Sequence, residues 1–251
     1  MSQSKACCTV PPATATNYTP KGTYTTLPPS SHSLKTYVTG PEDAPTALLI
    51  IYDIFGFYPQ TLQGADILAS ADPSHPRRVF MPDWFEGAPC PLEWYPPDTA
   101  DKKEKVGKWF KEKAGFETHL PRIAEVVKEL KRSTGIKDWG LVGYCWGGKV
   151  AGLLSGAESE FKATAVCHPA FVDPADGEKI ARPFLMVPSG DEDEGDVGKW
   201  EEKVKGVKKV VWFKGQVHGF MAARGDLEDE NVRKAYEEGY GLVLDHFKEH
   251  L

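Results

Sequence analysis

The chain has 251 residues, of which 41% are hydrophobic, 11% are aromatic and 26% are charged. These fractions are close to those of soluble globular proteins, so they exclude coiled coils, collagen-like repeats and disorder as descriptions of the whole chain. A formal charge of −6, from 30 Lys and Arg against 36 Asp and Glu, offers no attraction to nucleic acid or anionic lipid. The longest apolar run, residues 47–52, is far shorter than the roughly 20 residues of a membrane-spanning helix. The N-terminus has no apolar stretch suited to a signal peptide, so we expect a cytoplasmic protein that binds neither nucleic acid nor a membrane.

Residues 1–30 are rich in Thr, Pro, Ser and Ala and show no sustained period, which predicts an extended N-terminal arm. One domain, residues 31–251, follows it. The arm contains Cys7 and Cys8, which have no second pair at zinc spacing, so we expect no metal there. The chain has five cysteines, an odd number at irregular spacing, and no secretory signal, which indicates free thiols.

Short apolar runs alternate with amphipathic stretches in the rest of the chain. The predicted strands are residues 34–38, 47–52, 79–81, 140–142, 163–167, 183–187 and 210–213. The predicted helices lie near residues 123–130, 148–156, 194–205 and 229–249. This alternation of apolar strands and helices predicts an α/β fold with a mainly parallel, twisted sheet and helices on both faces. In such folds ligands bind beyond the carboxyl ends of the strands.

The segment Gly143-Tyr144-Cys145-Trp146-Gly147 lies between a predicted strand and a predicted helix. A strand, a sharp turn flanked by glycines and a helix make a nucleophile elbow, here with Cys145 in place of serine. The positive end of the helix dipole favours the thiolate. The alternative is a buried cysteine in a glycine-rich turn, with no catalytic role.

A nucleophilic cysteine needs a base, and the α/β-hydrolase fold orders the residues as nucleophile, acid and histidine. His218 follows the last predicted strand and precedes the last helix, where that histidine belongs. His168 follows a strand end and could line the pocket, whereas His246 and His250 are expected in solvent on the terminal helix.

The acid should follow the strand at residues 183–187, where an acidic run begins. A carboxylate there would accept the imidazole N–H, fix the tautomer and stabilise the imidazolium. We prefer Asp191, keep Asp193 as the alternative, and interpret the rest of the run as a solvated helix start.

The strand at residues 47–52 ends in Asp53-Ile54-Phe55-Gly56, the position from which an oxyanion-hole donor arises. We expect the backbone N–H groups of Ile54 and Trp146 to bind the oxyanion, because backbone donors are pre-aimed. Asp53 is expected to project toward the nucleophile. The alternative is that residues 53–56 simply end a strand and turn.

Four motifs, at residues 52–56, 81–85, 143–148 and 218–220, resemble in order and spacing the dienelactone hydrolases, or carboxymethylenebutenolidases. The similarity covers residues 30–251 and is greatest to the fungal members. It implies an α/β-hydrolase fold and a Cys-His-Asp triad without a metal, carried here by Cys145, His218 and Asp191.

In that family a carboxylate, usually Glu, contacts the resting nucleophile, and Asp53 occupies its position with one methylene less. Bacterial members also bind the substrate carboxylate through two arginines. Glu86 and Ala222 stand near those positions here, and Arg224 is the nearest substitute. An acidic Glu86 in place of a cation favours a neutral substrate over an anionic one.

The expected function is therefore hydrolysis of a small-molecule ester or lactone by a monomer or homodimer, with no cofactor. The expected substrate-binding residues are Trp84, Phe85, Phe220 and Arg224. Two alternatives remain: an inactive hydrolase-fold protein that binds or senses a small molecule through Cys145, and a thioesterase or acyl transferase.

Overall fold

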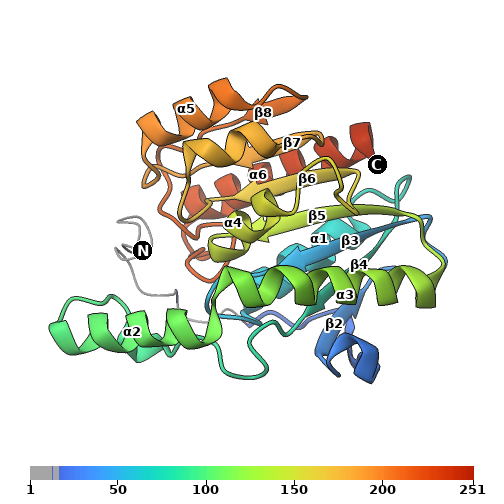
Figure 1. Ribbon diagram of the computed structural model, residues 1–251, viewed down its shortest axis with the longest axis horizontal. Coiled ribbons are helices and arrows are strands. Elements are labelled where there is room, and N and C mark those ends of the chain that lie inside the picture. The colour runs from blue at the N-terminus through green and yellow to red at the C-terminus, as the bar shows by residue number, and fades with distance from the viewer. Residues whose placement is uncertain (1–12, 14–16) are drawn as a thin grey trace.

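The computed structural model describes residue 13 and residues 17–251, which form one sheet covered by helices (Figure 1). The strands are β1 (Thr23–Thr26), β2 (Lys35–Thr39), β3 (Thr46–Ile51), β4 (Arg77–Pro82), β5 (Asp138–Tyr144), β6 (Ala163–Cys167), β7 (Phe184–Val187) and β8 (Lys208–Val210). Their spatial order is β1-β2-β4-β3-β5-β6-β7-β8. The pairs β1–β2 and β2–β4 are antiparallel, and every later pair is parallel. The predicted mainly parallel sheet is confirmed.

Helices cover both faces of this sheet, as the sequence predicts. The helices are α1 (Pro59–Ser70), α2 (Ala100–Lys113), α3 (Phe116–Thr134), α4 (Trp146–Leu153), α5 (Glu194–Lys203) and α6 (Glu230–His250), with short 3₁₀ turns η2 (Pro29–Ser31), η3 (Leu92–Trp94) and η4 (Pro174–Lys179). Helices α3, α4 and α5 lie in front of the sheet in Figure 1, and α1 and α6 lie behind it. Helix α2 extends away from the body of the molecule.

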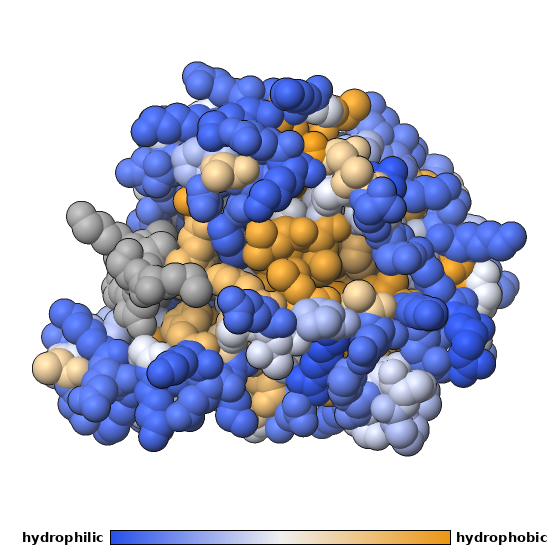
Figure 2. All heavy atoms as spheres, viewed as in Figure 1, coloured by the Kyte–Doolittle hydropathy of each residue, from blue (hydrophilic) through white to orange (hydrophobic). Residues whose placement is uncertain are grey.

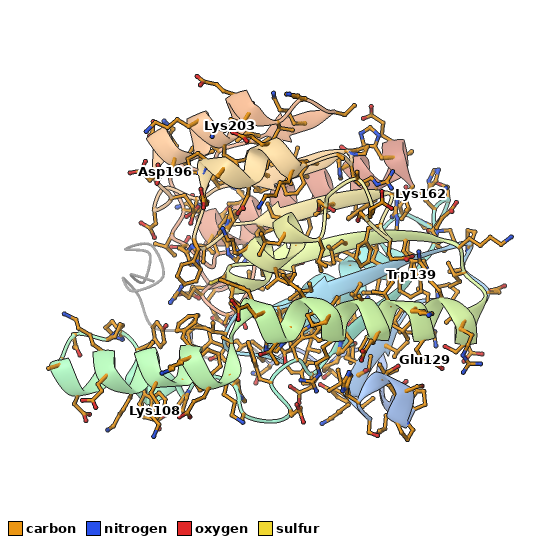
Figure 3. The ribbon with its side chains drawn as sticks, in the orientation of Figure 1. Lys108, Glu129, Trp139, Lys162, Asp196 and Lys203 are labelled. Atoms are coloured by element: carbon orange, nitrogen blue, oxygen red, sulfur yellow. The ribbon has the colours of Figure 1, made fainter. Side chains whose placement is uncertain are left out.

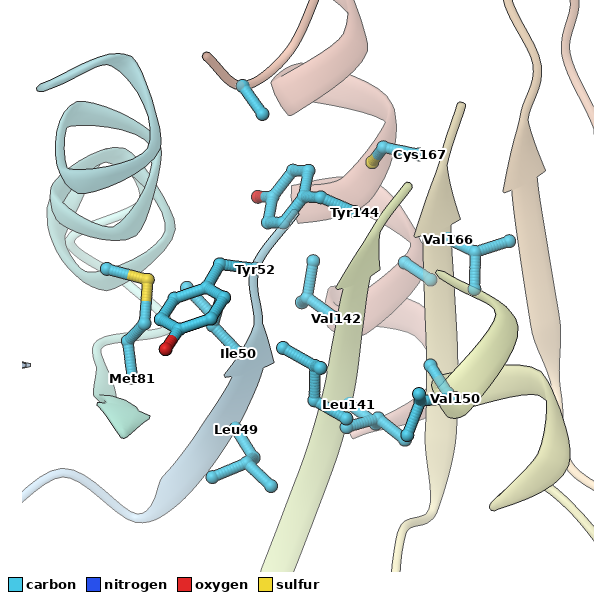
Figure 4. Close-up of a cluster of buried hydrophobic side chains, with 14 of the residues drawn as sticks. Leu49, Ile50, Tyr52, Met81, Leu141, Val142, Tyr144, Val150, Val166 and Cys167 are labelled. Atoms are coloured by element: carbon cyan, nitrogen blue, oxygen red, sulfur yellow. The ribbon is translucent and has the colours of Figure 1, made fainter. Parts of the chain in front are cut away.

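The central strands are buried on both sides, which explains their nearly continuous apolar sequence. Figure 4 shows Val142 and Tyr144 of β5 on one side of the sheet, while Leu141 lies beside Val150 of α4. Helix α6 packs closely on β5, because a Cβ added at Gly140 would overlap the aromatic ring of Phe247.

Three features of the fold differ from the sequence-based expectations. Residues 23–26, assigned to the arm, form the edge strand β1; all four are exposed, so no apolar alternation marks them. The last strand ends at Val210 rather than Phe213, although Phe213 still makes an isolated parallel bridge to Ser189. Helices α1 and α2 were not predicted. Cys7 and Cys8 lie outside the described residues.

The surface in Figure 2 is mostly hydrophilic around an apolar patch at the centre of the view, over α4. Charged side chains such as Lys108, Lys162 and Lys203 project outward, whereas Trp139 lies inside and stacks on Phe80 (Figure 3). Within residue 13 and residues 17–251, we find no helix of the length and apolarity that crossing a membrane requires.

Candidate active site

Cys145 lies at the sharp turn between β5 and α4, where the nucleophile elbow was predicted. Its backbone has φ 53° and ψ −113°, a strained left-handed conformation for a residue with a side chain. The flanking glycines are required, because a Cβ on Gly143 would overlap the carbonyl of Gly147, and one on Gly147 would overlap that of Ile51. The predicted strand–turn–helix geometry is therefore confirmed.

The end of β6 supports this turn through two backbone hydrogen bonds. The N–H of Cys145 donates to the carbonyl of Cys167 over 3.2 Å, and its carbonyl accepts from the N–H of Ala170 over 3.0 Å. The strain at the elbow is thus balanced by neighbouring structure. The side chain of Cys145 is buried in a tightly packed turn.

His218 lies in the loop that follows β8 and is fully buried. Its Nδ1 is 2.6 Å from Oε1 of Glu192, and the other oxygen of that carboxylate accepts the backbone N–H of Ser189. A carboxylate at this distance fixes the proton on Nδ1, which leaves Nε2 as the basic nitrogen. The imidazole therefore has the orientation and tautomer of a general base.

The acidic residues at positions 191–193 have different roles from those expected from the sequence. Asp191 accepts the backbone N–H of His218 through Oδ2 over 2.8 Å. Asp193 caps α5 by accepting the backbone N–H of Asp196 over 2.9 Å. Glu192, interpreted from the sequence as part of a solvated helix start, is only 6% exposed and carries the contact with the imidazole. That interpretation was wrong, because the turn after β7 directs this side chain inward.

Sequence reasoning could have removed Asp193 but could not have found Glu192. An acid directly before a helix with further acids in its first turn is an N-cap pattern, and capping uses the side chain of Asp193. A loop has no period, however, so no spacing signal separates Asp191 from Glu192.

The loop after β3 presents the N–H of Ile54 as a free donor. The carbonyl of Asp53 accepts from Gly56 over 3.3 Å, and the carbonyl of Ile54 accepts from Cys90 over 2.8 Å. The N–H of Phe55 donates to Oδ1 of Asp53 over 2.9 Å. The two peptide units beside Ile54 contain four polar groups: the carbonyls of Asp53 and Ile54 and the N–H groups of Ile54 and Phe55. Of these four, only the N–H of Ile54 has no hydrogen-bond partner among the described residues.

Trp146 supplies the second predicted donor, because it is the first residue of α4. The first N–H groups of a helix have no acceptor within that helix. Its indole is held below the turn, with Nε1 donating to the carbonyl of Ala114 over 3.0 Å. The two predicted oxyanion donors thus come from positions where backbone N–H groups are available.

Asp53 is 2% exposed, and both its oxygens accept backbone N–H groups, those of Phe55 and Ala223. Burial raises the pKa of Asp53 to about 6, although these N–H groups and Arg224 act to lower it. Contact between Asp53 and Cys145 stays a prediction.

The four residues expected to bind substrate occupy two kinds of environment. Trp84 donates its indole N–H to the carbonyl of Ile50 over 3.1 Å, and Phe85 packs against Trp146 at 4.8 Å between ring centroids. These two side chains are buried in the core beneath the site. Phe220 packs within 5.9 Å of the ring of His168, close to His218.

Arg224 lies against the loops that carry Asp53 and His218. Its guanidinium carbon is 5.4 Å from the ring centroid of Phe55 and 5.7 Å from that of Tyr95, which is cation–π geometry. Its Nη1 donates to the carbonyl of His218 over 3.3 Å. A buried cation is therefore present near the site.

Glu86 does not present an isolated negative charge. Nη2 of Arg122 lies 2.7 Å from its Oε1, so the two charges compensate each other. The argument from Glu86 against an anionic substrate is weakened by this pair.

His168, expected from the sequence to line the pocket, is the clearest further feature of the site. It follows β6 with φ 38°, is fully buried, and has no hydrogen-bond partner on either ring nitrogen within the described part of the chain. Its ring is 5.2 Å from that of His218, in an edge-on arrangement. Burial, followed by the nearby His218 and Arg224, lowers the pKa of His168 well below its usual value, so the ring is neutral.

The described residues contain no group of three or more His, Cys, Asp or Glu side chains that could hold a metal ion. The elbow that carries the thiol is bonded to the end of β6, where His168 packs against His218, so the thiol, the imidazole with its carboxylate and the backbone N–H donors all lie at the carboxyl end of the sheet. This set is suited to nucleophilic acyl transfer.

A model of the dienelactone hydrolase family matches residues 34–251. An uncharacterized AIM2 family protein of Schizosaccharomyces pombe is 34% identical over 221 residues, covering 86% of this chain and 87% of that protein. A carboxymethylenebutenolidase homolog of Homo sapiens is 29% identical over 197 residues, covering 75% of this chain and 76% of that protein.

Solved structures show the same fold at low sequence identity. A putative dienelactone hydrolase from Klebsiella pneumoniae is similar with a TM-score of 0.70 at 15% identity, covering 91% of this chain and 98% of that one. A dienelactone hydrolase from Anabaena variabilis is similar with a TM-score of 0.67 at 16% identity, covering 92% of this chain and 99% of that one.

Proposed function

The chain belongs to the dienelactone hydrolase family and is a hydrolase of the ester and lactone class, and from this premise we propose that Cys145, His218 and Glu192 form its catalytic triad. The observation that carries the proposal is the buried contact of 2.6 Å between Nδ1 of His218 and Oε1 of Glu192. Glu192 takes the role that the sequence assigned to Asp191.

In the first half of the reaction, Nε2 of His218 accepts the proton of the Cys145 thiol, and the sulfur attacks the ester carbonyl carbon. The carbonyl oxygen becomes an oxyanion, which the N–H groups of Ile54 and Trp146 bind. The imidazolium, stabilised by Glu192, then gives its proton to the departing alkoxide, and a thioester remains on Cys145.

In the second half, Nε2 of His218 takes a proton from water, and the resulting hydroxide attacks the thioester carbonyl. The same two N–H groups bind the second oxyanion. The C–S bond breaks, the carboxylic acid leaves, and the thiolate of Cys145 recovers the proton from His218. An ester or lactone suits a sulfur nucleophile, because an alkoxide leaves more readily than an amine.

Arg224 bears on the substrate class. Its guanidinium lies over the rings of Phe55 and Tyr95, so a substrate bound beside these residues would contact aromatic surface and one buried cation. The charge of Glu86 is compensated by Arg122. We therefore propose that a lactone with one carboxylate is accepted alongside neutral lactones, with Arg224 as the cation that binds it.

The test is hydrolysis of p-nitrophenyl acetate and of matched neutral and carboxylated lactones by the wild type, Cys145→Ala and Arg224→Gln. Cys145→Ala should lose at least about 10³-fold in kcat, because the nucleophile is removed. Arg224→Gln should raise KM for the carboxylated lactone alone. Full hydrolysis by Cys145→Ala would refute the proposed triad.

The same assay separates the alternative functions. A protein that senses ligands would form a stoichiometric thioester on Cys145, seen by mass spectrometry, without turnover. An acyl transferase would turn over only after a second nucleophile better than water is added. Either result would replace the hydrolase proposal.

A further inference from the structure

The carboxylate of Asp53 connects two loops that carry catalytic groups. Oδ1 accepts the N–H of Phe55 over 2.9 Å, and Oδ2 accepts the N–H of Ala223 over 3.3 Å. Phe55 follows the oxyanion donor Ile54, while Ala223 lies five residues after His218 in the same loop. One buried side chain thus spans the oxyanion side and the base side of the site.

The direction of the Ile54 N–H depends on the two peptide planes beside it. Three hydrogen bonds fix these planes: Gly56 to the Asp53 carbonyl, Cys90 to the Ile54 carbonyl, and Phe55 to the Asp53 side chain. The first two are bonds between backbone groups, so Asp53 alone provides a side-chain contact that substitution can remove.

The length of the side chain matters for this contact. An aspartate can accept the backbone N–H two residues further along, as an Asx turn, whereas the longer glutamate is not typical of that turn. The contact between Asp53 and Phe55 has this spacing. Aspartate at position 53 therefore makes a contact that a glutamate there would not typically make.

We propose that Asp53 is a positioning residue, whose carboxylate fixes the Ile54 N–H relative to His218 by holding Phe55 and Ala223. This role rests on the proposed function, and it differs from contact with the resting nucleophile. Loss of the hydrogen bond to the N–H of Phe55 should misplace one oxyanion donor.

The variants Asp53→Asn and Asp53→Glu separate the two roles. The amide of Asp53→Asn keeps an oxygen for the N–H of Phe55, so kcat should fall by no more than about 10-fold. Asp53→Glu keeps the charge but loses the Asx turn, so kcat should fall by about 10²-fold or more, as when an oxyanion donor is lost. A carboxylate that acts on the nucleophile predicts the reverse order, with the glutamate variant the more active.

Alkylation of Cys145 by iodoacetamide across pH 5 to 9 gives a second readout, because alkylation needs the thiolate but no oxyanion donor. Its pH profile should be unchanged in Asp53→Glu, which keeps the charge, and a shifted profile in that variant would overturn the positioning role. Asp173→Ala is the matched control, since Asp173 makes the same turn to the N–H of Ala175 over 2.9 Å outside the site. Circular dichroism of each variant verifies folding.

Failure of the inference and failure of the proposed function give different results. If the wild type shows no turnover that depends on Cys145, the proposed function fails whatever the Asp53 variants do. If the wild type is active and Asp53→Glu retains its kcat, the inference alone is overturned.

Discussion

Two buried histidines lie at opposite ends of β6 and have different surroundings. His168 follows the carboxyl end of the strand, beside His218, and neither of its ring nitrogens has a hydrogen-bond partner in the described part of the chain. His246 of α6 packs near the amino ends of β6 and β7, and its Nε2 also has no hydrogen-bond partner among the described residues. Burial lowers the pKa of both histidines, so both are neutral near pH 7.

The comparison teaches that burial alone does not identify a functional histidine. A buried polar group without a partner lowers the free energy of unfolding by about 1–3 kcal/mol, so each such group destabilises the fold. The two rings differ in their neighbours, because the ring of His168 lies 5.2 Å from that of His218, whereas the ring of His246 lies 4.9 Å from that of His250. We therefore assign His168, and not His246, to the candidate site.

The largest effect is expected at the carboxyl end, from Glu192→Gln. The amide can donate to Nδ1 of His218 and so favour the wrong tautomer, and kcat should fall by about 10³- to 10⁴-fold. The steady-state rate with p-nitrophenyl acetate measures it. Asp191→Asn is the matched control, because its remaining oxygen still accepts the N–H of His218, and less than about 10-fold should be lost. A larger loss in Asp191→Asn than in Glu192→Gln would restore Asp191 as the triad acid.

This contrast also shows how far the sequence could predict the molecule. Hydrophobic patterning located six of the eight strands and the elbow at Cys145, because apolar runs and glycines record burial and tight turns directly. The predicted strand at residues 210–213 shares only Val210 with β8. It did not locate Glu192, since the direction of a side chain in a loop depends on contacts distant in sequence. His246 was expected in solvent, and that expectation was wrong. His246 lies in the part of α6 that packs on the sheet, a contact between segments distant in sequence.

A smaller effect is expected from His168→Leu, which has a similar volume and no polar atoms. The free energy of unfolding should rise by about 2–3 kcal/mol, because two unpaired polar atoms leave the core. At the same time kcat should fall by about 10-fold, because His218 loses the flat polar ring that packs edge-on against its own. Urea unfolding monitored by tryptophan fluorescence, together with the steady-state rate, measures both changes.

His168→Gln is the matched control for that experiment. It keeps polar atoms at the position and should gain no stability. If His168→Leu lowers the free energy of unfolding, a hydrogen-bond partner for the ring exists in the folded protein, and the predicted gain in stability is refuted.

The smallest effect is expected at the amino end, in the pH dependence of stability. The pKa of His246 is about 4 in the folded protein, below its usual 6.5, so the unfolded chain binds more protons between these values. The stability that neutral His246 contributes is complete above pH 6.5 and is lost as the pH falls toward 4. Between pH 7 and pH 5 this loss should be about 1–2 kcal/mol.

His246→Leu should remove that part of the pH dependence, measured as the difference in free energy of unfolding between pH 7 and pH 5. Asp53 changes the free energy of unfolding with the opposite sign, because its raised pKa makes the folded state bind more protons below about pH 6. Asp53 is present in both the wild type and His246→Leu, so its contribution cancels when the two are compared. His168 has the same sign as His246, since its pKa is also lowered, so the double variant should show the flattest profile. An unchanged slope in His246→Leu would mean that this ring binds its proton as readily in the folded protein as in the unfolded chain, and it would refute the lowered pKa of His246.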